Sequence, residues 1–294
     1  MERIAIVGLG LMGASLGMAL KQARGNARTP VIAGYARRAS VRKYAVKHRM
    51  VDEVFGSPGA AIRDAELVVF CVPILSIPVL VGQARKDFRQ GCVVTDVGST
   101  KAEITTRIER LLDGRSVEYV GSHPIAGSEK QGIESAQADL YRGAVVIVTA
   151  TGRESSGAVR AVSGLWTHLG AAVKRMTPQD HDRIMARTSH LPHLAAALVA
   201  STAGREGDLD KLAAYCGPGF RDTTRIAEGS SDVWLDVFRS NLGSVERELK
   251  AFESQLQKLL KTIHKRDYRA LKIFLEKSGS KRKSLTSGGV PLKK

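Results

Sequence analysis

The sequence predicts an α/β fold in which a doubly wound, mostly parallel sheet is followed by an all-helical domain. Three observations point to it. Short apolar runs alternate with helical patterns up to about residue 175, a glycine-rich turn follows the first run, and no convincing strand pattern is found after residue 177. Strands that alternate with helices in this way form parallel sheets covered on both faces. A chain of 294 residues is also long enough to bury a core in one or two domains.

Seven apolar runs are the candidate strands of the first domain. Several are apolar without alternation, which is typical of strands covered on both faces. They span residues 3–8, 31–35, 67–72, 92–97, 117–121, 144–150 and 171–176. We therefore place the first domain at residues 1–176.

A glycine-rich turn, Gly8-Leu9-Gly10-Leu11-Met12-Gly13, joins the first run to a helical stretch. In this strand–turn–helix context the pattern predicts a Rossmann-type dinucleotide site. Gly8 permits the tight turn, Gly10 lets a pyrophosphate approach the backbone, and Gly13 allows the helix to pack closely on the strand. The helix N-terminus then offers N–H groups and a positive dipole end to the phosphates.

The end of the second strand indicates which dinucleotide is bound. A carboxylate at this place normally binds the ribose 2′-hydroxyl of NAD, whereas this chain has Ala36-Arg37-Arg38. Ala36 removes the repulsion that a carboxylate would exert on a 2′-phosphate, and the two arginines offer donors for it. Arginines on a surface loop can also be merely solvated. We expect NADP, with NAD as the alternative. Val72, at the end of the third run, and Pro73, just after it, are further candidate cofactor-binding residues.

The second domain begins at Thr177-Pro178-Gln179-Asp180, which has an N-cap threonine, a proline at the first helical position and an acidic first turn. Farther on, apolar residues recur at alternating steps of three and four, which is a heptad seam. They are Leu242, Val245, Leu249, Phe252, Leu256, Leu259 and Ile263. Such a seam can pack one long helix on its own domain, but its length favours a helical dimerisation domain at residues 177–277 and a homodimer.

Much of the net charge of +16 lies near the C-terminus, where 12 Lys or Arg and two acidic residues fall between Lys258 and Lys294. We expect residues 278–294 to be a basic flexible tail. Such a tail attracts polyanions without specificity. The sequence has no zinc-finger spacing or RNP-type motif beside it, so we expect no nucleic-acid function.

The uncharged run at residues 4–20 has the length of a short membrane span, but four glycines interrupt it. We therefore expect no membrane segment. The three cysteines have no CxxC spacing and favour reduced thiols. We expect a cytoplasmic protein.

Two polar segments follow predicted strands, where ligands bind in open α/β sheets. The first is Gly121-Ser122-His123-Pro124-Ile125-Ala126-Gly127-Ser128-Glu129, and its glycines and proline predict a loop around His123. The second contains Ser99, just after the run at residues 92–97.

The helical domain carries a second set of candidates. Ser189 and His193 are one helical turn apart and share a face. A glycine-broken loop then carries Asp222 and Arg225 toward Trp234.

The histidines of this domain do not predict a metal site. His181, His190 and His193 lack the HExxH spacing, and no acidic or cysteine ligand completes the set.

Taken together with the glycine turn, these segments resemble the prephenate/arogenate dehydrogenase family of tyrosine biosynthesis, in the same order and spacing from residue 1 to about 275. The resemblance implies oxidative decarboxylation of a cyclohexadienyl substrate. Hydride passes to the nicotinamide, the 4-hydroxyl loses its proton, and CO₂ departs as the ring becomes aromatic. It further implies that His123 accepts the hydrogen bond of the 4-hydroxyl, a task suited to a neutral imidazole, and that Ser99 orients that hydroxyl. Ser99 could equally cap the next helix.

The resemblance also implies binding roles for a small anionic substrate. His193 and Ser189 would contact it, and Arg225 would hold a carboxylate through two parallel hydrogen bonds. Asp222 could orient Arg225, and Glu129 would join an ionic network at the pocket mouth. An ordinary surface ion pair is the alternative for these charges.

Some alternatives stay open. The resemblance implies that Trp234 forms part of the wall of the substrate pocket; the alternative is an ordinary core residue. Prephenate and arogenate differ by a keto group against an ammonium; we expect prephenate, with arogenate as the alternative. A β-hydroxyacid dehydrogenase shares the domain plan, but its catalytic lysine has no counterpart motif here. A dinucleotide-binding regulator with a basic tail is a rival of another class.

Overall fold

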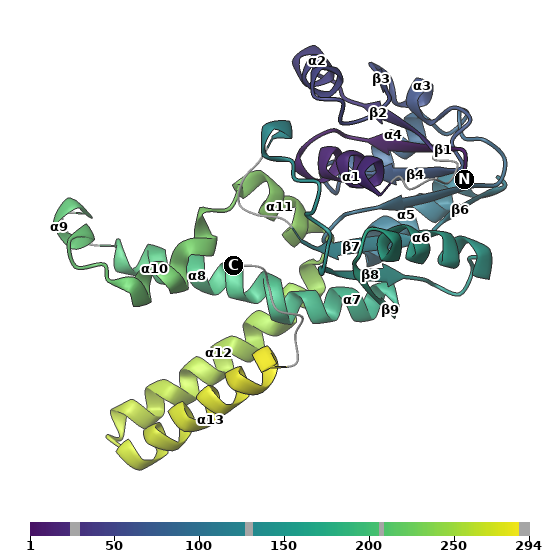
Figure 1. Ribbon diagram of the computed structural model, residues 1–294. Coiled ribbons are helices and arrows are strands. Elements are labelled where there is room, and N and C mark those ends of the chain that lie inside the picture. The colour runs from purple at the N-terminus through teal and green to yellow at the C-terminus, as the bar shows by residue number, and fades with distance from the viewer. Residues whose placement is uncertain (24–29, 127–131, 206–208, 288–294) are drawn as a thin grey trace. The chain divides into compact units, whose positions relative to one another are not determined.

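Six strands form the main sheet of the first unit (Figure 1). The computed structural model describes residues 1–23, 30–126, 132–205 and 209–287. The strands are β1 (Arg3–Val7), β2 (Val31–Tyr35), β3 (Glu53–Phe55), β4 (Leu67–Phe70), β5 (Cys92–Asp96) and β6 (Val117–Tyr119). The helices between them are α1 (Leu11–Gln22), α2 (Ala39–Lys47), α3 (Pro58–Ile62), α4 (Ser76–Gln83) and α5 (Ala102–Leu112). The three-residue β3 is not among the predicted strands, because it is too short to leave an apolar run.

The sheet has the strand order β3-β2-β1-β4-β5-β6, with every neighbouring pair parallel. In this order the winding reverses between β1 and β4, and ligands bind in the crevice at the carboxyl ends of those strands. The predicted α/β class with a doubly wound sheet is confirmed.

Alternate side chains of β1 enter two different cores. Ile4 and Ile6 are buried with residues of α1, whereas Ala5 and Val7 are buried with residues of α3, α4 and α5. A strand covered on both faces has no polar side, which explains the unbroken apolar runs in the sequence.

A second, smaller sheet follows the first. It consists of β7 (Gly121–Ile125), β8 (Val145–Thr149) and β9 (Ala172–Met176), with η1 (Ile133–Ser135) and α6 (Ser156–His168) between them. β8 pairs antiparallel with β7 and parallel with β9. Two corrections follow: the runs at 144–150 and 171–176 are outside the main sheet, and the predicted loop around His123 is strand β7. Pro124 is tolerated there because β7 is an edge strand.

Helices make up the rest of the first unit. They are α7 (Pro178–Met185), the π-helical η2 (Ala186–His190), α8 (Leu191–Ala203), α9 (Leu209–Ala213), α10 (Pro218–Thr224), the 3₁₀ turn η3 (Arg225–Glu228) and α11 (Ser231–Ser240). The predicted helix start is confirmed, since the Thr177 hydroxyl accepts a 3.1 Å hydrogen bond from the Asp180 backbone N–H and Pro178 opens the helix. A π-helical turn within a helix is rare and is often found at functional sites.

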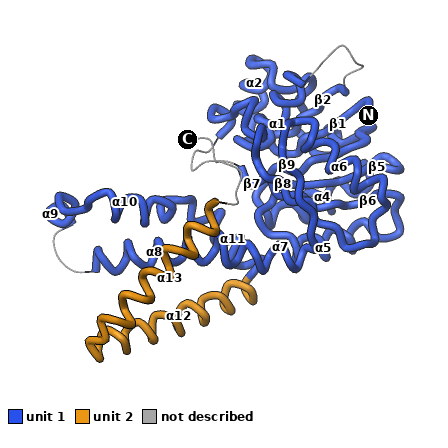
Figure 2. Tube along the Cα trace, turned by 60° about the horizontal axis from the view of Figure 1, so that its bottom comes forward, with its two compact units in different colours: residues 1–241 blue, residues 242–294 orange. Residues whose placement is uncertain are grey.

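The chain divides into two compact units, residues 1–241 and 242–294 (Figure 2). The first unit thus includes residues 177–241 of the predicted helical domain. In the second unit, α12 (Leu242–His264) and α13 (Tyr268–Ser287) pack against each other. All seven seam residues lie on the single helix α12, and Leu249, Phe252 and Leu256 remain 38–42% exposed.

The first part of the basic flexible tail expected at residues 278–294 is helical, because α13 continues through Ser287; residues 288–294 lie outside the described residues. Lysine and arginine are good helix formers, so the basic composition of residues 278–287 is compatible with a helix.

The apolar run at residues 4–20 is divided between β1 and α1. Across the described ranges, none of the helices has both the length and the apolar character needed to cross a bilayer.

Candidate active site

The glycine turn after β1 lies at the carboxyl edge of the main sheet, where the winding reverses. Gly8 has φ +108°, and a Cβ there would stand 2.4 Å from the Cys71 carbonyl oxygen. A Cβ on Gly13 would stand 1.8 Å from the Gly8 carbonyl oxygen. Gly10, by contrast, has open space where its Cβ would be. The first two positions therefore need glycine for packing, and the third leaves the backbone accessible to a ligand.

The N-terminus of α1 is suited to a phosphate. Its N-cap is Gly10, no side chain caps it, and its first turn contains no acidic residue. Leu9 belongs to the buried core, Leu11 is half-buried, and the Met12 carbonyl accepts a 2.7 Å hydrogen bond from the Tyr141 hydroxyl. Backbone groups, rather than the Leu9 side chain, are thus what this turn offers to a dinucleotide.

The residues after β4 lie beside this turn, at the same edge of the sheet. The Val72 Cγ1 atom lies 2.6 Å from where a Cβ on Gly8 would stand, and Pro73 is exposed. Both are at the carboxyl end of the strand that neighbours β1. Their place fits the predicted cofactor contact.

The turn after β2 is held by a residue that the sequence did not single out. The Arg42 Nη1 atom donates to the carbonyls of Ala36 and Arg37, at 2.9 and 2.8 Å. Ala36 is buried, whereas Arg37 and Arg38 are exposed. Within the described ranges neither of these two arginines has a side-chain hydrogen bond or ion pair, so both guanidinium groups remain available to an anion.

Ser122 fixes the strand that carries His123. Its fully buried hydroxyl donates to the Asp96 carbonyl. It is also 3.0 Å from the Thr95 hydroxyl, and it accepts a 3.0 Å hydrogen bond from the Trp166 indole. These contacts attach β7 to the end of β5, so the neighbouring His123 is held beside the strand that leads to Ser99.

A buried ion pair between Asp96 and Lys101 closes the turn that contains Ser99. The Asp96 carboxylate also accepts from the Tyr119 hydroxyl at 2.8 Å and from the backbone N–H groups of Gly98 and Ser122, at 2.8 and 3.2 Å. Burial lowers the pKa of Lys101, while the charge of Asp96 opposes that shift. Four donors, one of them the Lys101 ammonium, thus converge on one carboxylate beneath the turn.

Ser99 does not cap the next helix. The N-cap position of α5 is Lys101, and the backbone N–H groups of Lys101 and Ala102 donate to the Asp182 carboxylate at 2.7 and 2.8 Å. Asp182 is therefore what caps α5, and it reaches there from α7. Ser99 is half-buried and remains the predicted orienting residue.

His123 has a defined hydrogen-bond partner. Its Nδ1 atom is 2.8 Å from Nε2 of His181, whose Nδ1 atom is 2.7 Å from an Asp182 carboxylate oxygen. Burial first, and then electrostatic repulsion from neighbouring His181 and Lys101, hold the pKa of His123 well below 6.5. The imidazole is therefore neutral at neutral pH, as a proton acceptor must be.

His193 and Trp234 form a stacked pair in the helical wall, with ring centroids 3.6 Å apart and planes 16° apart. Gly229 makes this possible, because a Cβ there would be 2.7 Å from the indole nitrogen of Trp234. The Nδ1 atom of His193 is buried without a hydrogen-bond partner in the described part of the chain. An unsatisfied buried polar atom is costly, so a ligand that bonded it would relieve that cost.

The other predicted substrate residues are near the surface. Ser189 is half-buried in η2, one turn before His193. Asp222 in α10 and Arg225 at the start of η3 are both exposed. Glu129 lies outside the described residues.

The sequence did not assign a role to several residues that organise this site. They are Ser122, Asp96, Lys101, His181, Asp182 and Gly229. Of these residues, only Asp96 could have been identified from the sequence, because it is a charged residue at the carboxyl end of a buried strand.

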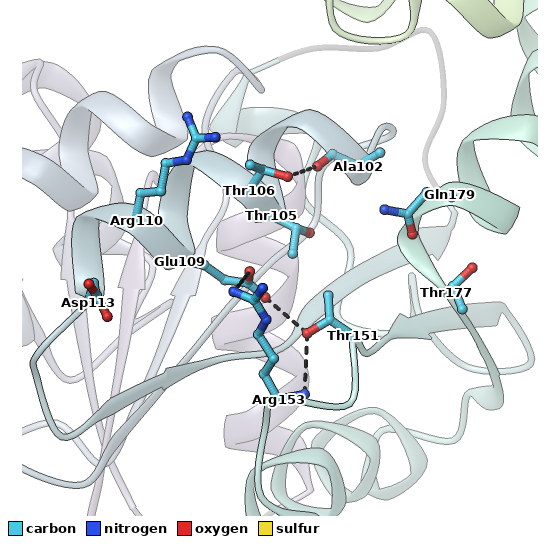
Figure 3. Close-up of a pocket in the computed structure, with 10 residues that line it drawn as sticks. All are labelled: Ala102, Thr105, Thr106, Glu109, Arg110, Asp113, Thr151, Arg153, Thr177 and Gln179. Carbon is cyan, nitrogen blue, oxygen red and sulfur yellow. Dashed lines mark hydrogen bonds and ion pairs between the residues drawn. The ribbon is translucent and has the colours of Figure 1, made fainter.

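An open pocket of about 540 Å³ lies elsewhere, along α5 and the start of α7 (Figure 3). The Thr151 hydroxyl and the Arg153 guanidinium both bond Glu109 within it. None of the predicted site residues lines it. Its charges are surface pairs of small energetic value, so we do not place the active site there.

No cluster of three or more potential metal ligands is found among the described residues.

Comparison with known proteins covers both halves of the chain. Residues 17–175 match the family model for the prephenate dehydrogenase nucleotide-binding domain, and residues 177–277 match that for the prephenate dehydrogenase dimerization domain. Prephenate dehydrogenase of Lactococcus lactis is 30% identical over 287 residues, which are 97% of this chain and 78% of that protein. Cyclohexadienyl dehydrogenase of Zymomonas mobilis is 29% identical over 270 residues, 90% of each protein.

Solved structures of the same family are also similar to this chain. Prephenate dehydrogenase of Aquifex aeolicus, in complex with hydroxyphenyl propionate and NAD+, has a TM-score of 0.89 at 30% identity, covering 97% of this chain and 98% of that one. Arogenate dehydrogenase of Synechocystis has a TM-score of 0.83 at 28% identity, covering 97% and 100%. These matches span both the dinucleotide crevice and the helical wall, and they confirm the resemblance noted in the sequence. The chain belongs to the prephenate dehydrogenase family of dinucleotide-dependent oxidoreductases.

Proposed function

We propose that the chain converts prephenate to 4-hydroxyphenylpyruvate and CO₂ in tyrosine biosynthesis, with His123 as the base and NADP as the preferred acceptor. The observation that carries the proposal is the neutral imidazole of His123, fixed by Ser122 next to the strand that leads to Ser99. The Aquifex prephenate dehydrogenase, solved in complex with hydroxyphenyl propionate and NAD+, supports the same reaction class.

The dinucleotide, when bound, supplies the hydride acceptor for C4 of the substrate. The residues suited to hold it are Gly8, Gly10 and the N-terminus of α1. His123 takes the proton of the 4-hydroxyl as the carbonyl forms. The electron pair of the breaking ring–carboxylate bond then completes the aromatic ring, and His123 returns the proton to the phenolate oxygen as CO₂ leaves. General-base help of this kind is worth about 10²–10⁴ in rate.

The remaining candidates orient the substrate. His193, stacked on Trp234, presents a buried Nδ1 atom that a substrate group can bond. Arg225 is suited to a carboxylate through its planar guanidinium. Ser189 lies one turn before His193, and we propose Asp222 and Glu129 as the acidic members near the pocket mouth.

Prephenate is preferred to arogenate because the described residues leave no buried carboxylate to pair with an ammonium. Among the described residues of the first unit, the buried carboxylates are those of Asp96 and Asp182, and both already accept several hydrogen bonds from the protein. An ammonium without such a partner pays a desolvation cost. Arogenate remains the second candidate, since an arogenate dehydrogenase is among the similar structures.

Steady-state kinetics with both substrates and both cofactors tests this proposal. We expect prephenate with NADP to give the highest kcat/KM. A higher kcat/KM for arogenate would reverse the substrate assignment. Absence of turnover in all four combinations would remove the proposed function itself.

The cofactor preference has its own test at the end of β2. Ala36→Asp should shift the ratio of kcat/KM for NADP over NAD toward NAD by about 10-fold or more, because a carboxylate there repels a 2′-phosphate and binds a 2′-hydroxyl. Ala36→Asn adds the same bulk without charge and should shift the ratio far less. An unchanged ratio in Ala36→Asp would mean that this turn does not choose the cofactor.

We further propose a homodimer joined through the α12 seam. The exposed apolar residues of this seam, among them Leu249, Phe252 and Leu256, would be buried by packing against a second copy of the chain. The family model that matches residues 177–277 is also that of a dimerization domain. The three free thiols suit the reducing cytoplasm, where we place the enzyme.

A further inference from the structure

We propose that His181 and Asp182 are positioning residues that select the tautomer of His123 and stabilise the charge that His123 acquires with the substrate proton. The three residues form a His–His–Asp triad (His123, His181 and Asp182) that crosses from β7 to α7. The inference rests on the proposed role of His123 as the base.

The direction of the hydrogen bonds starts at Asp182. Its two carboxylate oxygens accept from the backbone N–H groups of Lys101 and Ala102, at 2.7 and 2.8 Å. Two such donors at a helix N-terminus stabilise the ionised carboxylate, which can only accept. His181 must therefore carry its proton on Nδ1 and donate it to Asp182 across 2.7 Å.

The direction of the His181–Asp182 hydrogen bond determines the direction of the bond between His181 and His123. With its proton on Nδ1, neutral His181 has only an acceptor at Nε2. The contact of 2.8 Å between this atom and Nδ1 of His123 is then a bond in which His123 donates. The remaining nitrogen of His123, Nε2, is left unprotonated, and it is the atom that accepts the substrate proton.

The triad is held rigidly on the side away from β7. His181 is fully buried, and Asp182 is 2% exposed. The Asn241 side chain donates a 2.8 Å hydrogen bond to the Asp182 carbonyl, and the same nitrogen is 3.3 Å from His190 Nδ1. His181 therefore has little freedom to rotate away from His123, and its orientation is set before substrate binds.

The balance of charge also requires Asp182. Lys101, the nearby cation, is already neutralised by its ion pair with Asp96. When His123 becomes an imidazolium, it adds a positive charge near Lys101 and His190. Asp182, acting through His181, is the negative group aligned with that new charge. A charge-assisted hydrogen bond is about twice as strong as a neutral one, so the triad gains strength as the proton is transferred.

The test uses the full-length enzyme. The ¹⁵N NMR spectrum of the free wild-type protein should show His123 with a protonated Nδ1 and an unprotonated Nε2, and His181→Leu should abolish that preference. The same variant should lower kcat about 10- to 100-fold with KM nearly unchanged. His181→Gln, whose amide can accept from His123 and donate to Asp182, should restore most of the loss. The matched control is His168→Leu, at an exposed histidine of α6, and it should retain wild-type kcat.

Several results would overturn the proposal. One is an unprotonated Nδ1 on His123 in the wild-type spectrum. This measurement does not depend on whether any variant folds. Another is a wild-type kcat in His181→Leu, or a His181→Gln variant no better than the leucine one. Failure of the base assignment is separate, because it would show as undiminished turnover when His123 itself is replaced.

Discussion

Replacing His123 by asparagine should lower kcat by about two orders of magnitude or more and leave dinucleotide affinity unchanged. Asparagine can still bond His181, but it cannot take up a proton. The dinucleotide crevice is built from the turn after β1 and the residue after β4, and His123 contributes to neither. The measurements are kcat with prephenate and the fluorescence titration of the reduced dinucleotide.

The control for this substitution is His168→Asn, which changes an exposed histidine of α6 in the same way. It should keep kcat within about twofold. The pH profile of the wild-type enzyme adds an independent readout. Since burial holds the pKa of His123 well below 6.5, the base stays unprotonated through neutral pH, and kcat/KM should fall only in more acidic solution. A His123→Asn enzyme with wild-type turnover would mean that another group accepts the proton.

The main sheet could be predicted because its strands are buried on both faces. Residues such as Ile4 and Val7 enter opposite cores, so the runs are apolar throughout and stand out from the helices between them. The same reasoning missed β7, because Gly121 and Pro124 are typical of loops. Gly121 is needed for packing, since a Cβ there would be 2.5 Å from the Thr149 hydroxyl, and only the pairing with β8 makes this segment a strand.

The residues of the candidate site likewise fall into those that the sequence predicted and those that it did not. Sequence motifs identified the residues with their own chemistry, such as His123, Ser99 and His193. They did not identify the partners, because those come from distant parts of the chain. His123 meets His181 across 58 positions, and the Lys101 backbone meets Asp182 across 81. No period or local spacing encodes such contacts, and a lone Asp on a helix is ordinarily solvated.

The largest effect on stability is expected at Lys101. Lys101→Met should lower the free energy of unfolding by about 3–5 kcal/mol, because it leaves the Asp96 carboxylate charged, buried and without its cation. Methionine is similar in length and apolar, so the loss is one of charge compensation more than of volume. Urea denaturation at neutral pH measures it. Lys43→Met, at an exposed position of α2, should change stability by no more than about 0.5 kcal/mol.

A double variant separates the ion pair from the packing around it. Asp96→Asn together with Lys101→Met removes both charges, and the amide oxygen can still accept from Tyr119 or Gly98. Replacing a whole buried ion pair is often close to neutral, so the double variant should recover most of the stability. If it is as unstable as Lys101→Met alone, the lysine acts through its packing against Gly121. Recovery of stability without recovery of kcat would show that the ion pair holds the Ser99 turn in place for catalysis as well as holding the fold together.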